Sequence, residues 1–579
     1  MTFAETISFT YNKITSKMIR KSLLTTVLLA ASMQVFSQTL KLATAYKTDA
    51  CANPILPYNL CADPTAVEYK GRLYVYGTND QQELNTTKNT TKNTYGKINQ
   101  LVCMSTADLV NWTFHGTIDV KSISGWMNCS WAPSIVSREE SDGKTHFYLY
   151  YTNQASGIGM LTATSPTGPW TDPIGRALID WSTPGRGSQS NIIDPGVCID
   201  DEGNGWLSFG GGDPNSNGSK LMPGNARIVK LGKNMKSLAS EIKEIPAPFH
   251  FEANELNFIN GKFVFSYSGG WSCNSGDWSR YAGKGSYACP GNCSILMMQT
   301  DDPLNGEWKY TGEMLKNPGS FGYPWGNNHS HMQKFGEQWY MIYHTQYIEG
   351  KMGISGGYRS IALNPITVNE STVKITAPSM SNNGPGQLTA NRPTSDSYIE
   401  AECIANAAGI SAGKVSGASG GVAVTDIQAG DWTMIRGLKM TSEIKSVTAR
   451  LKGKCTMEIR AGSINSKPIA TIVSTSTAFR YYSVDLTDVI PEGKTFTYLY
   501  FVFTEASGTV QFDRYQFNAL SVEETTAIGA TPEADVQDGH DTYFYMNGVK
   551  QNDRPEKGLY IRQRTMPDGT RKSEKRMSR

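Results

Sequence analysis

The stretch Gly71-Arg-Leu-Tyr-Val-Tyr-Gly-Thr78 is one of five related segments between residues 71 and 346. Each segment has the length and aromatic content of a β-strand. A strand that recurs at similar spacing is typical of a β-propeller, with one copy in each blade. A β-sandwich would also contain short strands, but without a repeat of this length. We therefore predict an all-β protein that begins with a propeller. The other four segments are Thr145-His-Phe-Tyr-Leu-Tyr-Tyr-Thr152, Gly205-Trp-Leu-Ser-Phe-Gly-Gly211, Gly261-Lys-Phe-Val-Phe-Ser-Tyr-Ser268 and Gln338-Trp-Tyr-Met-Ile-Tyr-His-Thr345.

The composition limits the classes of function. The chain has 579 residues, which exceeds one ordinary domain, and we expect two or more. Its formal net charge is +2 without an evident basic face, so nucleic acid is not an expected partner. The 12 Trp, 28 Tyr and 20 Phe residues suit all-β domains, in which rings either pack in the core or stack on sugars.

The N-terminus resembles an export signal. Arg20 and Lys21 precede an apolar stretch over residues 23–35, which is too short to span a bilayer. We predict a signal peptide over residues 1–37, with the true start at Met18, and a protein that is secreted, periplasmic or at the cell surface. No other run is long enough to cross a membrane, and we expect a monomer.

Ten cysteines follow this segment, and an even number in an exported chain permits disulfides. The pairs considered first are Cys51 with Cys61, Cys403 with Cys455, and two of the three cysteines at 273, 289 and 293. Their spacing does not match a zinc site.

The chain divides into regions of different composition. Residues 45–377 contain the repeats, and residues 378–396 are rich in Pro, Gly, Asn and Ser, which indicates a linker. Short strands spaced as in a small β-sandwich follow over residues 397–519. We predict a flexible tail over residues 520–579, which is reminiscent of a C-terminal sorting segment.

Three acidic residues stand close to repeat strands, each beside apolar residues or a proline: Asp63, Asp194 and Glu252. Hydrolysis of a glycosidic bond with inversion needs a protonated acid and an ionised base. Glu252 has the most apolar surroundings, which favour the protonated form, so it suits the acid. Asp63 suits the base, and Asp194 could raise the pKa of the acid by repulsion. Glu255 competes for the acid role, and an Asp before Pro is also common in turns.

Several motifs resemble glycoside hydrolase family 43. They are Asp63-Pro-Thr-Ala-Val67, Trp131-Ala-Pro-Ser134, Ile193-Asp-Pro-Gly196, Phe251-Glu-Ala253 and Asn327-Asn-His329. The arabinoxylan arabinofuranosidase branch is suggested by residues 71–80, 108–112, 168–173 and 358–360. This resemblance covers residues 53–369 and implies a five-bladed propeller and an inverting enzyme. It assigns Asp63 as general base, Asp194 as pKa modulator and Glu252 as general acid.

The resemblance also implies supporting residues around the site. His329 corresponds to a histidine near a central ion, often calcium, and His331 could share that role; a core histidine is the alternative. Arg359 corresponds to an arginine that contacts the sugar, with a surface salt bridge as the alternative. The expected walls of the pocket are Asn79, Asp80, Trp131, Asn191 and Trp271.

The second domain resembles carbohydrate-binding module family 6 through Tyr398-Ile-Glu-Ala-Glu402, Gly430-Asp-Trp432 and residues 512–517. Such modules hold a structural calcium, here through Glu400, Glu402 and Asp513, and oxygen ligands suit that ion. Trp432 and Tyr482 are the candidate sugar-binding rings. Gln511 stands where an asparagine is expected, so a purely structural sandwich is an open alternative.

These observations predict an enzyme that removes α-L-arabinofuranosyl groups from plant cell-wall arabinoxylan or its oligosaccharides, without an organic cofactor. A β-xylosidase, an arabinanase or a galactanase would use the same three carboxyl groups. A polysaccharide-binding protein that has lost catalysis is the alternative outside enzymes.

Overall fold

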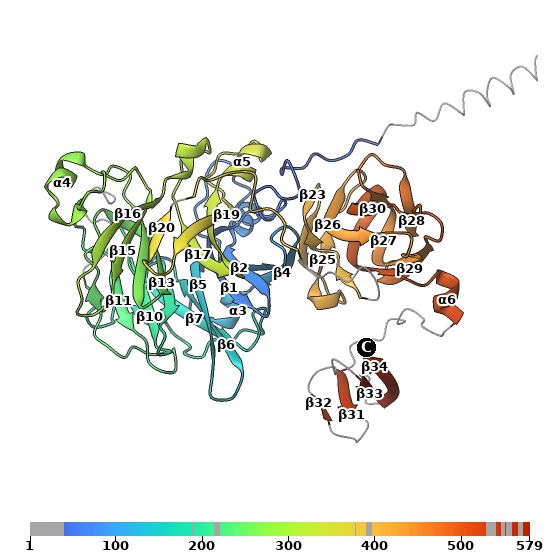
Figure 1. Ribbon diagram of the computed structural model, residues 1–579, viewed down its shortest axis with the longest axis horizontal. Helices are drawn as coiled ribbons and strands as arrows, with labels where there is room; N and C mark the ends of the chain where they lie inside the picture. The colour runs from blue at the N-terminus through green and yellow to red at the C-terminus, as the bar shows by residue number, and fades with distance from the viewer. Residues whose placement is uncertain are drawn as a thin grey trace, which may run out of the picture. The chain divides into compact units, whose positions relative to one another are not determined.

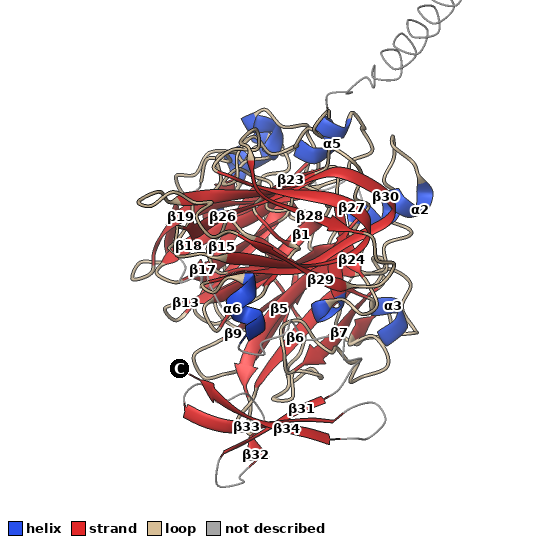
Figure 2. Ribbon diagram, turned by 90° about the vertical axis from the view of Figure 1, so that its right-hand side faces the viewer, coloured by secondary structure: helices blue, strands red, loops and turns tan. Residues whose placement is uncertain are grey.

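The computed structural model describes residues 40–187, 190–212, 220–376, 378–389, 397–527, 540–545, 550–551, 558–565 and 571–578. The predicted signal peptide lies outside these residues. Every element described below belongs to one compact unit, Ala43–Arg579. Strands dominate it and the helices are short (Figures 1 and 2).

The first part of the chain forms a five-bladed propeller. Each blade is an antiparallel sheet of four consecutive strands, and the first blade gains a fifth from the second domain. The blades are β1 (Ala62–Tyr69), β2 (Arg72–Thr78), β3 (Leu101–Thr106) and β4 (Trp112–Ile118); β5 (Trp131–Glu139), β6 (Thr145–Thr152), β7 (Gly157–Ala163) and β8 (Ile179–Asp180); β9 (Gly196–Ile199), β10 (Gly205–Phe209), β11 (Arg227–Lys230) and β12 (Lys243–Glu244); β13 (His250–Ile259), β14 (Lys262–Gly269), β15 (Ile295–Thr300) and β16 (Lys309–Leu315); and β17 (Ser330–Phe335), β18 (Gln338–Thr345), β19 (Ser360–Asn369) and β20 (Lys374–Thr376).

The five repeated segments are the second strands of the five blades, which confirms the predicted organisation. Each contributes a fully buried ring to the packing between sheets, so the aromatic repeat is mainly a core feature. These rings are Tyr76, Tyr150, Phe209, Tyr267 and Tyr343. The first strands contact one another in the closed order β1, β5, β9, β13, β17 and back to β1. They therefore form the inner ring of the propeller.

The inner strands are irregular where their chains enter the ring. Register shifts lie between Ala62 and Thr65 and between Trp131 and Ser134. Left-handed backbone occurs nearby, with φ of 49° at Asp63 and 51° at Asp194. Such bulges redirect side chains, and strained non-glycine residues often occur at functional sites. The distortions therefore indicate a functional site at this end of the ring.

The second domain is a strand-rich module with its own core. It contains β21 (Ile399–Glu400), β22 (Cys403–Ile404), β23 (Asn406–Ala408), β24 (Ser411–Lys414), β25 (Val422–Thr425), β26 (Trp432–Met440), β27 (Ser446–Ala461), β28 (Pro468–Ser474), β29 (Arg480–Asp485) and β30 (Phe496–Asn518). One path of strands runs β23-β26-β30-β25-β24, and β27 pairs with β28, β29 and β30. The arrangement is consistent with the predicted β-sandwich.

Backbone pairing joins the two domains. Strand β22 pairs with β4 of the first blade, with Cys403 opposite Thr113. Asn111 Nδ2 donates to the Arg436 carbonyl at 2.7 Å, and Arg436 N donates to Asn111 Oδ1 at 2.9 Å. Part of the predicted linker also packs on the propeller, because Asn53 Nδ2 donates to the Ser381 carbonyl at 2.8 Å.

The C-terminal region differs from the prediction of a flexible tail. It contains α6 (Val522–Ala527) and a four-stranded sheet of β31 (His540–Tyr545), β32 (Lys550–Gln551), β33 (Gly558–Thr565) and β34 (Arg571–Ser578).

None of the cysteine pairs considered first is bonded in this structure. The ten cysteines all lie in the described part of the chain, where they are present as thiols. Most are buried within apolar cores, including Cys61 and Cys455. Among the described residues, no helix has the length and hydropathy needed to cross a membrane.

Candidate functional site: a carboxylate cavity on the propeller axis

A cavity of about 190 Å³ opens where the five blades meet. It contains all three carboxyl groups selected from the sequence, carried by inner strands or the segments directly before them. Residues more than 290 positions apart, such as Asp63 and Arg359, hydrogen-bond within it. The lining residues are Asp63, Tyr95, Trp131, Ala132, Ala155, Asn191, Ile193, Asp194, Glu252, Asn327, His329 and Arg359.

Asp63 is held as a carboxylate. Burial by itself would raise the pKa of this group, but the Arg359 guanidinium lies 2.8 Å from Oδ1. Nearby His344 and His329 add to this effect, and together the three hold the pKa of Asp63 well below its usual range. The Asp63 backbone N–H donates to His344 Nδ1 at 3.1 Å, and the other ring nitrogen of His344 lies 3.0 Å from the Asn327 carbonyl. Both ring nitrogens of His344 are thus held by backbone groups.

Arg359 is positioned by Asp80. Its Nε and Nη2 atoms each donate to the Asp80 carboxylate at 2.9 Å, and its backbone N–H donates to the same group at 2.9 Å. Asp80 is the first residue of α2 (Asp80–Thr87) and is fully buried. A bidentate pair of this kind fixes the guanidinium plane. Asp80 was predicted as a pocket wall, but it lies behind the wall and supports Arg359.

Glu252 has the opposite protonation preference. Burial and the Asp63 charge raise the pKa of Glu252 to about 7, although Arg359 and the Asn327 amide oppose the increase. Burial, Glu252 and Asp63 likewise raise the pKa of Asp194. Ala253 directly follows Glu252, and its N–H donates to Asp194 Oδ2 at 2.7 Å. This hydrogen bond holds the Asp194 carboxylate against the backbone next to Glu252. Because each group disfavours ionisation of the other, the pair retains a proton near neutral pH.

Glu255 is separated from this cavity. It is 1% exposed, lies outside the cavity lining, and pairs with His331 at 3.2 Å. Ser134 Oγ donates to it at 3.4 Å. The geometry thus favours Glu252 over Glu255 for contact with a substrate, because only Glu252 reaches the cavity.

The other expected walls fall into two groups. Trp131 and Asn191 line the cavity, as predicted. Asn79 does not, because its side chain caps α2 by accepting from Gln82 N. Trp271 also lies outside the lining, in the segment that follows the end of β14 at Gly269.

Sequence reasoning missed Tyr95 and His344. Tyr95 stands in a loop after α2. The centre of its ring lies 5.1 Å from the guanidinium carbon of Arg359, and its backbone carbonyl accepts a hydrogen bond from Trp131 Nε1. No local pattern marks such a loop residue. His344 ends the fifth repeat strand, and its polar side chain inside an apolar run was the signal that could have identified it.

The rings predicted to bind sugar in the second domain do not form a shared site. Trp432 is 7% exposed, and its indole N–H donates to the Ala43 carbonyl at 2.9 Å. Tyr482 packs against the sandwich core and accepts from Ser474 Oγ at 3.0 Å. Trp432 therefore does not present its ring to solvent, because the chain near Ala43 covers it.

The predicted calcium ligands Glu400, Glu402 and Asp513 have different hydrogen-bond partners. No group of three or more His, Cys, Asp or Glu side chains suited to a metal occurs in the described residues. Asp513 instead accepts from Arg450 at 2.6 Å. However, Glu400 Oε2 and Glu402 Oε2 are buried without a hydrogen-bond partner in the described structure. Burial, together with Glu400 and Asp513, raises the pKa of Glu402 to about 10, so a cation would suit this place.

On the propeller axis, one buried carboxylate oxygen without a hydrogen-bond partner indicates a place for a cation. Glu255 Oε1 is buried and has no hydrogen-bond partner within the described ranges. It stands beside His331, while His329 lies 3.6 Å from Asp63 Oδ1. A hard cation could satisfy this oxygen near the two histidines.

Comparisons with known proteins agree with the geometry. A model described as "Glycosyl hydrolases family 43" matches residues 51–373. An arabinoxylan arabinofuranohydrolase of Bacillus subtilis is 35% identical over 493 residues, covering 80% of this chain and 92% of the relative. One of Paenibacillus polymyxa is 35% identical over 399 residues, covering 66% of this chain and 60% of that protein.

A solved structure extends the likeness across both domains. It is a family 43 arabinoxylan arabinofuranohydrolase from Bacillus subtilis in complex with cellotetraose, 33% identical with a TM-score of 0.74. The match covers 82% of this chain and 99% of that one.

Proposed function

Because the chain belongs to glycosyl hydrolases family 43, we propose that it removes α-L-arabinofuranosyl side groups from arabinoxylan with inversion. The observation that carries the proposal is one small cavity in which Asp63 is held ionised while the pKa of Glu252 is raised to about 7. The names of its relatives support arabinoxylan as the substrate.

The chemistry follows from these two protonation states. Asp63 takes a proton from a water molecule as the water oxygen attacks the anomeric carbon. Glu252 gives its proton to the xylan oxygen as the bond between that oxygen and the anomeric carbon breaks. The products are arabinose with inverted configuration and a xylan hydroxyl. Glu252 is left ionised and Asp63 protonated, and exchange with solvent restores both.

Arg359 and Asp194 support this step without exchanging protons. Arg359 keeps Asp63 ionised and points into the same cavity, where it can donate to a sugar hydroxyl. Asp194 accepts a hydrogen bond from the backbone of the segment that carries Glu252, and the Glu252 charge raises the pKa of Asp194, so the two groups repel each other when both are ionised. We assign Asp194 as the modulator of the acid.

The size of the cavity supports removal of a terminal unit. Its volume of about 190 Å³ is below the roughly 300–1,000 Å³ of pockets that enclose larger ligands. A single pentose suits this space better than a continuous chain, which would need a groove open at both ends.

The proposal is tested by pairing two substrates with one stereochemical measurement. Hydrolysis of an aryl α-L-arabinofuranoside should exceed that of the matched aryl β-D-xyloside. Proton NMR on wheat arabinoxylan should detect the β-anomer of arabinose first. Preference for the xyloside would reject the assigned sugar, and initial release of the α-anomer would reject inversion.

Calcium and export belong to the same proposal. We assign calcium to Glu400 and Glu402 in the second domain, where two buried oxygens lack partners in the described structure. A second calcium is assigned near His329 and His331. The ions would neutralise buried charge and would take no part in the proton transfers.

A secreted or cell-surface monomer suits an insoluble plant polymer as substrate.

A further inference from the structure

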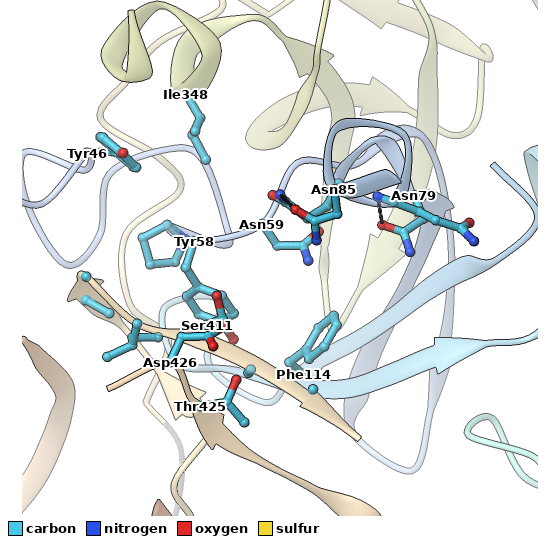
Figure 3. A pocket seen from close by; sticks show the side chains of 18 of the residues that line it. Tyr46, Tyr58, Asn59, Asn79, Asn85, Phe114, Ile348, Ser411, Thr425 and Asp426 are labelled. Atoms are coloured by element: carbon cyan, nitrogen blue, oxygen red, sulfur yellow. Dashed lines mark hydrogen bonds between the residues drawn. The ribbon is translucent and has the colours of Figure 1, made fainter. Parts of the chain in front are cut away.

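A second and larger cleft lies between the propeller and the second domain. Its volume is about 890 Å³, and it shares no lining residue with the carboxylate cavity. Figure 3 shows Tyr58, Asn59 and Phe114 on the propeller side and Ser411, Thr425 and Asp426 on the other. Pockets of this size at domain junctions are common ligand sites.

The lining is polar but nearly uncharged. Lys414 and Asp426 are its two charged residues, so the cleft does not suit phosphates or a strongly charged polymer. A carboxamide both donates and accepts hydrogen bonds, as a sugar hydroxyl does. Tyr46, Tyr58 and Phe114 add aromatic surface. Six carboxamide side chains line the cleft: Asn59, Asn79, Gln81, Gln82, Asn85 and Gln100.

Two polar atoms at this wall lack partners. Tyr58 Oη and Asn59 Oδ1 are buried and make no hydrogen bond within the described part of the chain. Asn59 is 8% exposed. Buried polar groups normally have a hydrogen-bond partner in the protein, in water or in a ligand. These two atoms therefore indicate that the wall can hydrogen-bond to a ligand.

The cleft is held in a fixed shape. Phe114 belongs to β4, which pairs with β22 of the second domain. The other wall includes β24, which pairs with β25. A preformed site loses less conformational entropy on binding than a mobile one. In contrast, the ring of Trp432 is covered by the chain at Ala43, so the second domain does not offer that ring to sugar.

One helix connects this cleft with the carboxylate cavity. Gln81, Gln82 and Asn85 of α2 line the cleft, while Asp80 in the first turn holds Arg359. We propose that the cleft binds an unbranched, neutral pyranose chain, separate from the site of hydrolysis. The choice of xylan as that chain rests on the proposed function. The bound chain keeps the polymer close to the cavity while side groups are removed.

The test fills the cleft at Gly413. This residue lines the cleft, and an added Cβ would meet no atom within 4 Å, so Gly413→Trp places a ring in open space. Gly125→Trp is the matched control, because it is also unobstructed but lies outside the lining. Xylohexaose and cellohexaose serve as probes, since neither carries an arabinosyl group.

Titration calorimetry and hydrogen exchange measure binding without turnover. We expect at least one probe to slow exchange in residues 79–87 and 407–414. Gly413→Trp should remove this protection and weaken binding about tenfold or more, while Gly125→Trp retains both. Asn85→Ala should weaken binding less. Hydrolysis of the small aryl arabinofuranoside should be unchanged in Gly125→Trp, which lies outside the lining of both the cleft and the carboxylate cavity.

Equal binding by Gly413→Trp and the parent protein would overturn the proposal, as would protection by neither probe. These results are independent of the proposed hydrolysis. A protein inactive on arabinofuranosides that still shows Gly413-dependent binding would reject the activity and support the cleft.

Discussion

The Asp80 carboxylate accepts two hydrogen bonds of 2.9 Å from the Arg359 guanidinium, which leaves Nη1 to donate to Asp63 at 2.8 Å. One buried carboxylate thus orients the cation that keeps another carboxylate ionised. Asp80 is a positioning residue, because it acts on the reaction through Arg359.

Replacing Asp80 should therefore change the pH profile as well as the rate. Asp80→Asn removes the charge that aligns Arg359, and a small misplacement of such a group can cost about 10²-fold in rate. The pKa of Asp63 should rise toward its usual range, so activity should fall at acidic pH, where the parent is still active. Steady-state kinetics across pH would measure this.

Asn79→Ala is the control for that change. It removes the cap of α2 but leaves the Asp80–Arg359 pair intact, and loss of a cap costs about 1 kcal/mol of stability. If both variants show the same pH profile, Asp80 acts only through the stability of the helix.

Glu252→Gln should separate substrates by their leaving groups. Without a proton donor, hydrolysis of arabinoxylan should fall by about 10²–10⁴-fold, the usual contribution of a general acid. An aryl arabinofuranoside with a good leaving group needs less protonation and should lose less. Parallel kinetics on both substrates, with circular dichroism to confirm folding, would measure the difference. An equal loss on both would contradict the assignment of Glu252 as acid.

The pH dependence should be governed by the acid. Because the pKa of Glu252 is raised to about 7, kcat/KM should fall as pH rises through this value and the proton is lost. Asp63 ionises at much lower pH, so it should not limit activity under mild acid conditions.

Asp194→Asn tests the modulator. Removing a carboxyl group that opposes ionisation of Glu252 should lower the pKa of the acid, moving the alkaline limb to lower pH. A lower rate with an unmoved limb would show that Asp194 orients the sugar and leaves the acid's pKa unchanged.

Calcium should stabilise the second domain. Glu402 has a pKa of about 10 in the absence of a cation, so calcium must displace its proton to bind. Scanning calorimetry with millimolar calcium should show a higher Tm, with a larger increase at higher pH. Chelator should reverse it.

Glu402→Gln is the specific variant for this site. It should remove the calcium-dependent increase of the second domain while leaving that of the propeller. A Tm insensitive to calcium in the parent protein would reject both proposed sites.

The sequence by itself determined the architecture of the propeller and the identity of its three carboxyl groups. The aromatic repeats are local, and burial of one ring in each blade requires little information from distant residues. The chemistry of Asp63, Asp194 and Glu252 was also readable from their apolar neighbours.

Only the tertiary structure decided which candidates reach the cavity. Asp80 lies behind Arg359, Glu255 lies outside the cavity lining beside His331, and Trp432 is covered by the chain at Ala43. These outcomes depend on contacts between residues up to 389 positions apart. Local pattern indicates whether a side chain is polar or apolar, but the neighbour that covers or pairs with it is chosen when distant segments pack together.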